Sequence, residues 1–126
     1  MDLGLKGKVA FVAAASRGLG RAVAEELAAE GTSLILCARN AETLNLVSKQ
    51  IAQTSNVSVF PVVADVSNEE DVAAAVKAGI EKFGRIDILV TNAGGPPAGQ
   101  FETLSREMWE AATRLTLNSV LELTRA

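Results

Sequence analysis

The sequence predicts an α/β domain in which helices cover both faces of a parallel sheet. Short, continuous apolar runs recur along the chain, and each is followed by a longer segment whose apolar residues repeat at helical spacing. Such runs are typical of strands buried on both faces, and strands that alternate with helices form parallel sheets. The 126 residues are about the size of one domain, and 48% of them are hydrophobic, which is enough for a buried core.

The first half of the chain contains two strand–helix pairs. Residues 8–14 predict a strand and 21–30 a helix, and residues 33–38 and 41–52 predict the second pair. Helical spacing predicts the buried faces, which are Ala22, Val23, Leu27 and Ala28 in the first helix and Leu44, Val47 and Ile51 in the second. The start of the chain faintly resembles a secretory signal, but Arg17 leads straight into an amphipathic helix, so we interpret the apolar run as a strand.

The second half continues the same alternation. A third strand is predicted over 57–63, and the helix after it has Ser67 or Asn68 as its N-cap, acidic residues in its first turn and Gly84 as its stop. A fourth strand is predicted over 86–91. It is apolar enough to lie in the middle of a sheet, so we expect both of its edges to be paired, although no fifth strand follows.

The last segment is predicted to be a loop followed by a long helix. Residues 92–99 are rich in glycine and proline, and residues 108–126 have helical character with a break near Ala112. The helix ends without the glycine, proline or polar tail that usually stops one. We therefore expect a domain that is truncated within a helix.

The composition excludes several classes of function. A net charge of −3 with scattered basic residues offers no binding surface for nucleic acid or an anionic membrane. No apolar run approaches the roughly 20 residues of a membrane-spanning helix. Cys37 is the only cysteine, which excludes an intrachain disulfide and indicates a reducing, cytoplasmic location. Because the chain has no histidine and no clustered carboxylates, no metal site is expected.

The loop between the first strand and the first helix is a candidate phosphate site. Gly18 and Gly20 follow a strand and open a helix, so backbone N–H groups can converge there on a pyrophosphate. Ser16 could add a hydroxyl donor and Arg17 a cation. A Walker A loop is excluded because no Gly-Lys-Ser/Thr follows. By itself, a loop with two glycines leaves open whether it binds a nucleotide or is only a tight turn.

The end of the second predicted strand indicates which nucleotide would bind. Dinucleotide-binding folds place an acidic residue there for the ribose hydroxyls of NAD, whereas an arginine accepts the 2′-phosphate of NADP. This chain has Arg39 and Asn40 at that place and no acidic residue before Glu42. NADP(H) is therefore favoured over NAD(H). The alternative for Arg39 is a solvated residue at the end of a strand.

Four motifs together resemble one family. They are AAASRGLG at 13–20, Ala-Asp-Val at 64–66, DILVTNAG at 87–94 and LTLNSV at 115–120. In this order, and over nearly the whole chain, they resemble the short-chain dehydrogenases/reductases, and more narrowly the 3-oxoacyl-acyl-carrier-protein reductase-like branch. The resemblance implies a Rossmann-type doubly wound parallel sheet, truncated after its fourth strand and the helices that follow. Residues 1–126 would then be a single dinucleotide-binding portion without the catalytic half.

The resemblance also implies roles for individual residues. The cradle for the phosphates and ribose would comprise Ala14, Ser16, Arg17, Gly18, Leu19 and Gly20. The other cofactor contacts would be Arg39 and Asn40 at the 2′-phosphate, Asp65 and Val66 at the adenine, and Asn92, Ala93 and Gly94 at the nicotinamide ribose. Asn118 would be the catalytic asparagine, which kinks a helix and holds a water in a proton relay. Simpler roles stay open: Asp65 as a turn cap, Asn92 in an Asx turn and Asn118 on an exposed helix face.

Two local departures from the family pattern affect these roles. Ala13-Ala14 replaces the usual Thr-Gly, and Thr91 replaces the first asparagine of Asn-Asn-Ala-Gly. We expect Ala14 to be tolerated only with a negative φ, and its methyl group to crowd the adenosine side of the cofactor. Thr91 is expected to lose a structural hydrogen bond without affecting chemistry.

A third departure concerns catalysis. The family's catalytic serine and Tyr-x-x-x-Lys lie beyond its asparagine, and this sequence contains no tyrosine. The resemblance therefore implies that the intact parent transfers hydride between NADPH and a small carbonyl or acyl substrate, whereas this chain alone is not catalytic. The helices after Ser105 correspond to those that pair subunits, which implies a homo-oligomer, a dimer or tetramer in the parent.

Two other classes of function stay under consideration. One is a non-catalytic dinucleotide-binding module, or a half-domain completed by a partner chain, for which the unpaired edge of the fourth strand leaves room. The other is an S-adenosylmethionine-dependent methyltransferase, which shares the strand–glycine–helix opening. Arg39 argues against the methyltransferase, because that site needs an acidic residue at the end of the second strand.

Overall fold

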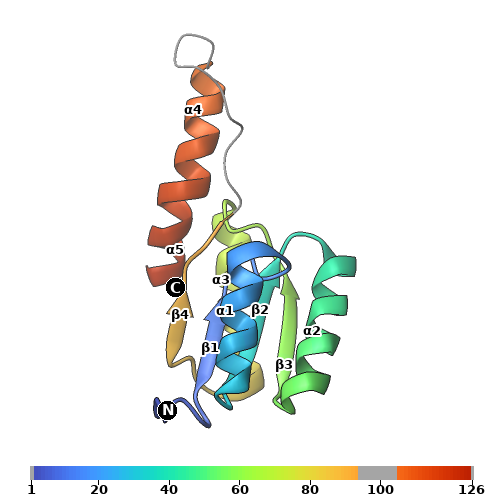
Figure 1. Ribbon diagram of the computed structural model, residues 1–126. Helices are drawn as coiled ribbons and strands as arrows, with labels where there is room; N and C mark the ends of the chain where they lie inside the picture. Colours follow the sequence, from blue (N-terminus) through green and yellow to red (C-terminus); the bar gives the residue numbers. More distant parts are fainter. Residues whose placement is uncertain (1, 94–104, 126) are drawn as a thin grey trace.

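The computed structural model of the chain describes residues 2–93 and 105–125. In chain order its elements are β1 (Val9–Val12), α1 (Gly18–Ala29), β2 (Ser33–Ala38), α2 (Ala41–Ser55), β3 (Val59–Val63), α3 (Glu69–Phe83), β4 (Ile88–Val90), α4 (Arg106–Thr113), η2 (Arg114–Asn118) and α5 (Ser119–Arg125). The element η2 is a π-helix, and α4, η2 and α5 follow one another as one continuous helical rod (Figure 1).

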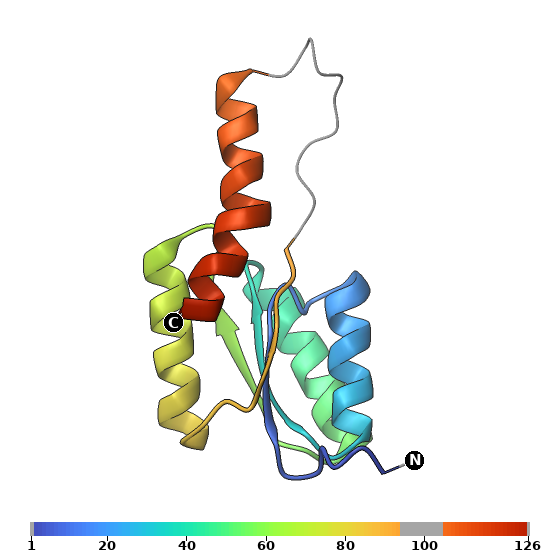
Figure 2. The same cartoon turned by 90° about the vertical axis from the view of Figure 1, so that its left-hand side faces the viewer.

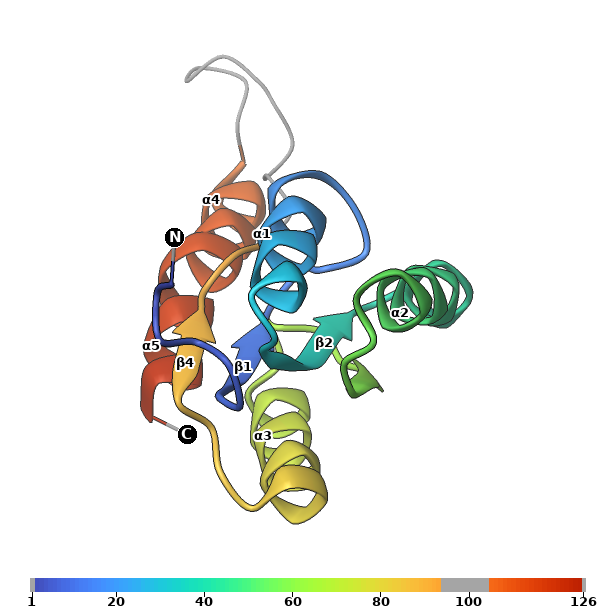
Figure 3. The same cartoon turned by 60° about the horizontal axis from the view of Figure 1, so that its bottom comes forward.

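The strands form one parallel sheet in the order β3-β2-β1-β4. Helices α1 and α2 cover one face of the sheet, while α3 and α5 lie on the other (Figure 2). Figure 3, with the lower end of the molecule turned forward, shows the same three layers. This arrangement confirms the predicted fold class and the four predicted strands.

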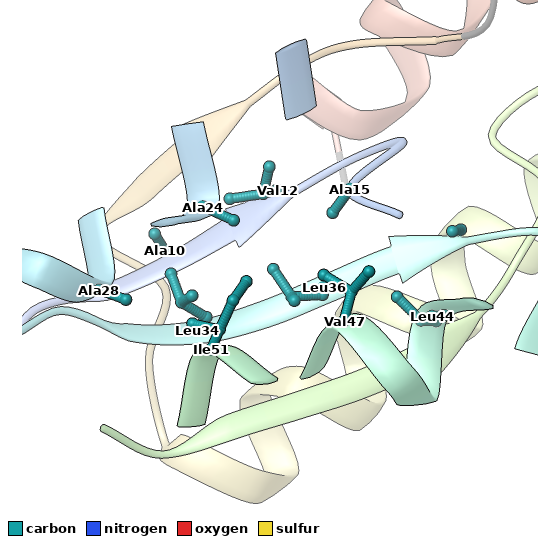
Figure 4. Packing of buried hydrophobic residues seen from close by; sticks show 11 residues of the cluster. Ala10, Val12, Ala15, Ala24, Ala28, Leu34, Leu36, Leu44, Val47 and Ile51 are labelled. Carbon is teal, nitrogen blue, oxygen red and sulfur yellow. The ribbon is translucent and has the colours of Figure 1, made fainter. Parts of the chain in front are cut away.

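The core consists of one apolar layer on each side of the sheet. Successive residues of a strand point to opposite faces, so Ala10 and Val12 of β1 join one layer while Phe11 joins the other. The layer under α1 and α2 is shown in Figure 4 and includes Ala24, Ala28, Leu34, Leu36, Leu44, Val47 and Ile51. In the opposite layer, Leu123 of α5 packs with Phe11, Ile35 and Val72. Leu44, Val47 and Ile51 are buried, which confirms the predicted face of α2.

The predicted face of α1 is partly wrong. The buried residues of this helix are Gly20, Ala24 and Ala28, whereas Ala22 is exposed. Alanines occur on both sides of this helix, so their spacing alone does not define its orientation. Small residues on the buried side allow α1 to approach the sheet closely.

The boundaries of α3 follow from the predicted signals. Asn68 is the N-cap, because its Oδ1 accepts a hydrogen bond from Asp71 N at 3.1 Å. Gly84 is the C-cap, with φ of 82° in the left-handed region that favours glycine. Of the two predicted N-cap candidates, Asn68 is therefore correct and Ser67 is not.

The irregularity in the last helix lies slightly later than predicted. It is the π-turn η2, in which Ser119 N donates to Arg114 O, five residues back. Neither α4 nor η2 buries a residue, whereas α5 buries Ser119 and Leu123 against the body of the domain. The rod therefore rises beyond the carboxyl end of the sheet and is held there through its last turns (Figure 1).

The two outer strands present different edges. Ser58 O accepts from Leu34 N and Ala64 N donates to Ala38 O, so the even-numbered residues of β3 bond to β2 and its odd-numbered residues face outward. Pro61 is one of the outward residues, and its lack of an N–H interrupts that edge. The three-residue strand β4 pairs with β1, and within the described ranges no strand pairs with its other side. The expected pairing on both edges of β4 is therefore not seen in that part of the chain.

Side chains connect the loops at the amino end of the sheet. Asp87 Oδ2 accepts hydrogen bonds from Val9 N at 2.9 Å and from Arg85 Nε at 2.8 Å. The bond from Val9, followed by the interaction with Arg85, lowers the pKa of the Asp87 carboxyl. Thr32 Oγ1 donates to Leu5 O at 3.1 Å, which holds the segment before β1 against the turn before β2.

Candidate functional site

A pocket of about 680 Å³ lies at the carboxyl ends of the strands. Its walls come from the loop after β1, the end of β2 with the start of α2, the loops after β3 and β4, and η2. The lining residues are Ala14, Ser16, Arg17, Gly18, Leu19, Ala38, Arg39, Asn40, Thr43, Ala64, Asp65, Val66, Asn92, Ala93 and Leu115. Ligands of open α/β sheets bind outside the carboxyl ends of the strands, which is where this pocket lies.

Ala14 adopts a conformation that the sequence did not predict. Its φ is +50°, in the left-handed region, although a tolerated alanine was expected to keep φ negative. That expectation is wrong for the described structure. The turn is held on both sides: Ala13 N donates to Val90 O at 3.1 Å and Ala15 N donates to Cys37 O at 3.0 Å. These contacts with two neighbouring strands impose the conformation on residue 14, at a cost of about 1 kcal/mol for a residue with a Cβ.

Gly20 brings the start of α1 against this turn. A Cβ on Gly20 would lie 2.2 Å from Ala14 O and 3.0 Å from Asn92 Nδ2. Only glycine fits so close an approach of two backbone segments. Gly20 is not among the residues that line the pocket, so its role in the described structure is to close the β1–α1 turn.

The rest of the predicted phosphate loop faces the pocket. Arg17 is the N-cap residue of α1 in an extended conformation, and its side chain makes no capping hydrogen bond to the helix. Gly18 has φ of 62°, and a Cβ there would meet no atom within 4 Å. Leu19 is 78% exposed. The first N–H groups of a helix lack intrahelical partners, so this end of α1 can accept an anion beside the Arg17 guanidinium.

The corner formed by the end of β2 and the start of α2 carries the second cation. Arg39 and Asn40 are exposed and line the pocket. Asn40 Oδ1 accepts from Thr43 N at 3.0 Å, so Asn40 caps α2. That cap brings Thr43, in the first turn of the helix, to the same wall of the pocket.

Asp65 takes the simpler of its two predicted roles, as a turn cap. Its Oδ1 accepts from Ser67 Oγ at 2.6 Å and from Ser67 N at 2.9 Å, which closes the turn before α3. Asp65 N also donates to Asp71 Oδ2 at 2.9 Å. The hydrogen bond from the Ser67 side chain, with a smaller contribution from the Arg39 guanidinium, lowers the pKa of the Asp65 carboxyl. Asp65 is therefore ionised at neutral pH.

The wall opposite Arg39 comes from the loop after β4 and from η2. Asn92, Ala93 and Leu115 line the pocket there, and Gly94 lies outside the described residues. Asn118 is exposed at the last position of the π-turn and is not among the lining residues. π-Turns occur frequently at functional sites, because they redirect the side chains on a helix.

Some lining residues were not predicted. Ala38 and Ala64 stand directly at the ends of strands, and Thr43 and Leu115 enter from helices. The strand-end position was a usable signal for the two alanines, and the N-cap Asn40 was one for Thr43. Leu115 reaches the pocket only through the tertiary placement of η2, which local sequence does not encode.

Two other features are not found among the described residues. These residues contain no cluster of three or more metal-ligating side chains. In the same ranges, no helix is long and apolar enough to cross a membrane. Cys37 is buried, and burial raises the pKa of its thiol to about 12, so it is not a reactive nucleophile near neutral pH.

Comparison with known proteins gives consistent matches. The family model described as short chain dehydrogenase matches residues 8–126. The oxidoreductase BOA17 of Botryotinia fuckeliana is 39% identical over 120 residues, which are 94% of this chain and 42% of that protein.

Solved structures match over nearly the whole chain. The L-sorbose reductase of Gluconobacter frateurii, complexed with NADPH and L-sorbose, is 34% identical with a TM-score of 0.96, over 99% of this chain and 48% of that one. An alcohol dehydrogenase of the archaeon Thermococcus sibiricus, complexed with 5-hydroxy-NADP, is 36% identical with a TM-score of 0.90, over 94% of this chain and 50% of that one. The chain thus spans about half the length of these relatives.

Proposed function

This chain belongs to the short-chain dehydrogenase family, and on that premise we propose that it is the cofactor-binding portion of an NADP(H)-dependent carbonyl reductase. The intact protein would transfer hydride between NADPH and a small carbonyl or acyl substrate. Residues 1–126 would form its dinucleotide-binding portion. A reducing cytoplasm and a homo-oligomeric parent, dimeric or tetrameric, belong to the same proposal. Exposed Leu117 and Leu121 on the helical rod support self-association.

The observation that carries the cofactor proposal is the position of Arg39. It lies at the end of β2 and lines the same pocket as the glycine loop. An arginine at this position suits a 2′-phosphate, because its guanidinium pairs with phosphate oxygens through two parallel hydrogen bonds. The pocket residues fit the rest of the cofactor as well. The start of α1 with Arg17 would hold the pyrophosphate, and the ionised Asp65 would accept a hydrogen bond from the adenine amine.

The remaining residues would orient the cofactor rather than react with it. Val66 would offer its backbone N–H to the adenine, and Asn92 and Ala93 would guide the nicotinamide ribose, with Gly94 beside them. When bound, NADPH supplies the hydride. Asn118 would hold a water for proton transfer in the intact protein. We propose that this chain alone is inactive, because its sequence has no tyrosine to donate the proton.

Titration of the purified 126-residue chain with NADPH and NADH by calorimetry tests this function. We expect NADPH to bind about 10- to 100-fold more tightly than NADH, since a charge-assisted phosphate contact contributes about 1.5–3 kcal/mol. Arg39→Ala should remove this difference by weakening NADPH alone. Arg106→Ala is the matched control, because Arg106 is an exposed arginine on α4 that does not line the pocket. Equal affinity for both nucleotides would refute the NADP preference, and no binding of either would refute the cofactor site.

A second candidate function is a dinucleotide-binding module without catalysis. Such a module could be completed by a partner chain, and within the described ranges no strand pairs with the outer side of β4, which leaves room for one. Both candidates predict NADPH binding, and they differ when the intact reading frame of the source gene is expressed. A longer product that oxidises NADPH in the presence of a carbonyl substrate supports the reductase. A product that ends at residue 126 in its native gene supports the module.

A further inference from the structure

We propose that Ala14 limits the affinity of this pocket for the adenosine half of NADP(H), because its methyl group cannot move aside. This inference rests on the proposed function, since it needs the pocket to bind that cofactor. Ala14 lines the pocket and is partly exposed, whereas Ala13 and Ala15 on either side of it are completely buried. Its carbonyl group faces Gly20, and the methyl group is its only side-chain group.

The turn around Ala14 is held on three sides. Ala13 N is bonded to Val90 O of β4 and Ala15 N to Cys37 O of β2, so the peptides on both sides of Ala14 are fixed to the two strands that flank β1. Gly20 closes the third side, because a Cβ at that position would lie 2.2 Å from Ala14 O. Rotation of residue 14 would break at least one of these contacts.

The position of the turn relates it to the adenosine end of the pocket. Cys37, which accepts the bond from Ala15 N, lies two residues before Arg39 on the same strand. A ligand whose 2′-phosphate meets Arg39 and whose pyrophosphate meets the start of α1 must pass the turn between them. Any ligand atom that approaches Ala14 there meets a fixed methyl group, and overpacking of one methyl in a rigid site typically weakens binding severalfold or more.

Backbone strain and methyl crowding have separable consequences. The positive φ of Ala14 is present with and without ligand, so its cost cancels in the dissociation constant and appears only in the stability of the fold. The contact between the methyl group and the ligand exists only in the complex, so it appears only in the dissociation constant. Replacement of Ala14 by glycine removes both terms, and two measurements can tell them apart.

The experiment uses the 126-residue chain and its Ala14→Gly variant. Calorimetric titration with NADPH and with 2′,5′-ADP, which is the adenosine half alone, gives the dissociation constants, and thermal unfolding gives Tm. We expect Ala14→Gly to bind both ligands about tenfold more tightly and to raise Tm by about 4 °C.

Asn56→Gly is the matched control. Asn56 is the other non-glycine residue of the described chain with a positive φ, at 54°, and it caps the far end of α2 away from the pocket lining. Its replacement relieves a positive φ without removing a group from the pocket. We expect a small rise in Tm and unchanged affinity for both ligands.

The outcomes separate this inference from the proposed function. If Ala14→Gly raises Tm but leaves both dissociation constants unchanged, the methyl group does not limit binding and the inference is wrong, while the cofactor site stands. An unchanged or lower Tm together with unchanged affinity would overturn it as well. If neither the wild type nor the variant binds either ligand, the proposed function fails and the inference fails with it.

Discussion

At the amino end of the sheet, side chains connect segments that are far apart in the sequence, whereas at the carboxyl end the side chains of Asn40 and Asp65 bond only a few residues ahead. Asp87 and Arg85 bond to Val9 and Gly7 across 78 residues, and Thr32 bonds to Leu5 across 27. At the carboxyl end, Asn40 bonds three residues ahead to Thr43, and Asp65 bonds two residues ahead to Ser67.

This difference accompanies a difference in what the two ends of the sheet do. The long-range bonds at the amino end hold separate segments of the chain to one another. The local bonds of Asn40 and Asp65 fix the shape of two loops that surround a pocket of about 680 Å³. The amino end therefore contributes stability, and the carboxyl end combines defined loop shapes with room for a ligand.

The largest loss of stability is expected at Gly20, where the start of α1 lies directly against the turn after β1. Gly20→Ala would place a Cβ 2.2 Å from Ala14 O, so the start of α1 must move away from the turn. We expect a loss of about 3 kcal/mol in the free energy of unfolding, measured by urea denaturation, together with loss of NADPH binding. Gly18→Ala is the control, since a Cβ there meets nothing within 4 Å and only its positive φ opposes it, at about 1 kcal/mol. Similar losses for both variants would contradict the close approach at Gly20.

A smaller effect is expected from the amino end, and it should depend on pH. Asp87→Ala leaves the N–H of the buried Val9 without its acceptor, so Tm should fall at neutral pH while the dissociation constant for NADPH is unchanged. Because folding lowers the pKa of Asp87, its contribution is fully present above the ordinary carboxyl pKa of about 3.9 and is lost as the pH falls through the lowered value.

Thermal unfolding of the wild type and of Asp87→Asn, followed from pH 7 downward, checks this sign. The difference in Tm should shrink on acidification, because the protonated aspartate and the asparagine then carry the same charge. Asp2→Asn serves as the control, since Asp2 accepts a bond from the nearby Gly4 N in an exposed segment. A difference that stays constant across the acidic range would show that the Asp87 charge has no role in stability.

The smallest loss of stability is expected from two N-cap residues at the carboxyl end, Asn40 and Asn68, of which one lines the pocket. Asn40→Ala and Asn68→Ala each remove an N-cap hydrogen bond, and each should cost about 1 kcal/mol of unfolding free energy. Only Asn40 lines the pocket, so only its replacement should also weaken NADPH binding in calorimetry. Equal effects of the two variants on affinity would mean that Asn40 acts only as a cap.

Where a local physical rule decides the structure, the sequence was sufficient to predict it. The run SLILCA predicts β2 with its observed bounds. Leu44, Val47 and Ile51 predict the buried face of α2, because these large apolar side chains are all buried only when that side of the helix faces the sheet. Gly84 predicts the end of α3, because a left-handed residue there favours glycine.

Where several elements act together, the sequence was not sufficient. The positive φ of Ala14 results from contacts with β2, β4 and Gly20 and contradicts the preference of alanine itself. The orientation of α1 was ambiguous because alanines occur on both of its sides. Most of the site could be predicted from strand ends and glycines, whereas Leu115 joins the pocket only because the helical rod lies above the sheet.

The interrupted edge at Pro61 has a consequence for polymerisation. A filament built by adding sheet to sheet needs two competent edges on every subunit, one to receive and one to offer a strand. On β3 the outward donor at the middle of the edge is missing, so that edge cannot complete a backbone ladder with a neighbour. Growth of such a filament through β3 is therefore blocked at Pro61.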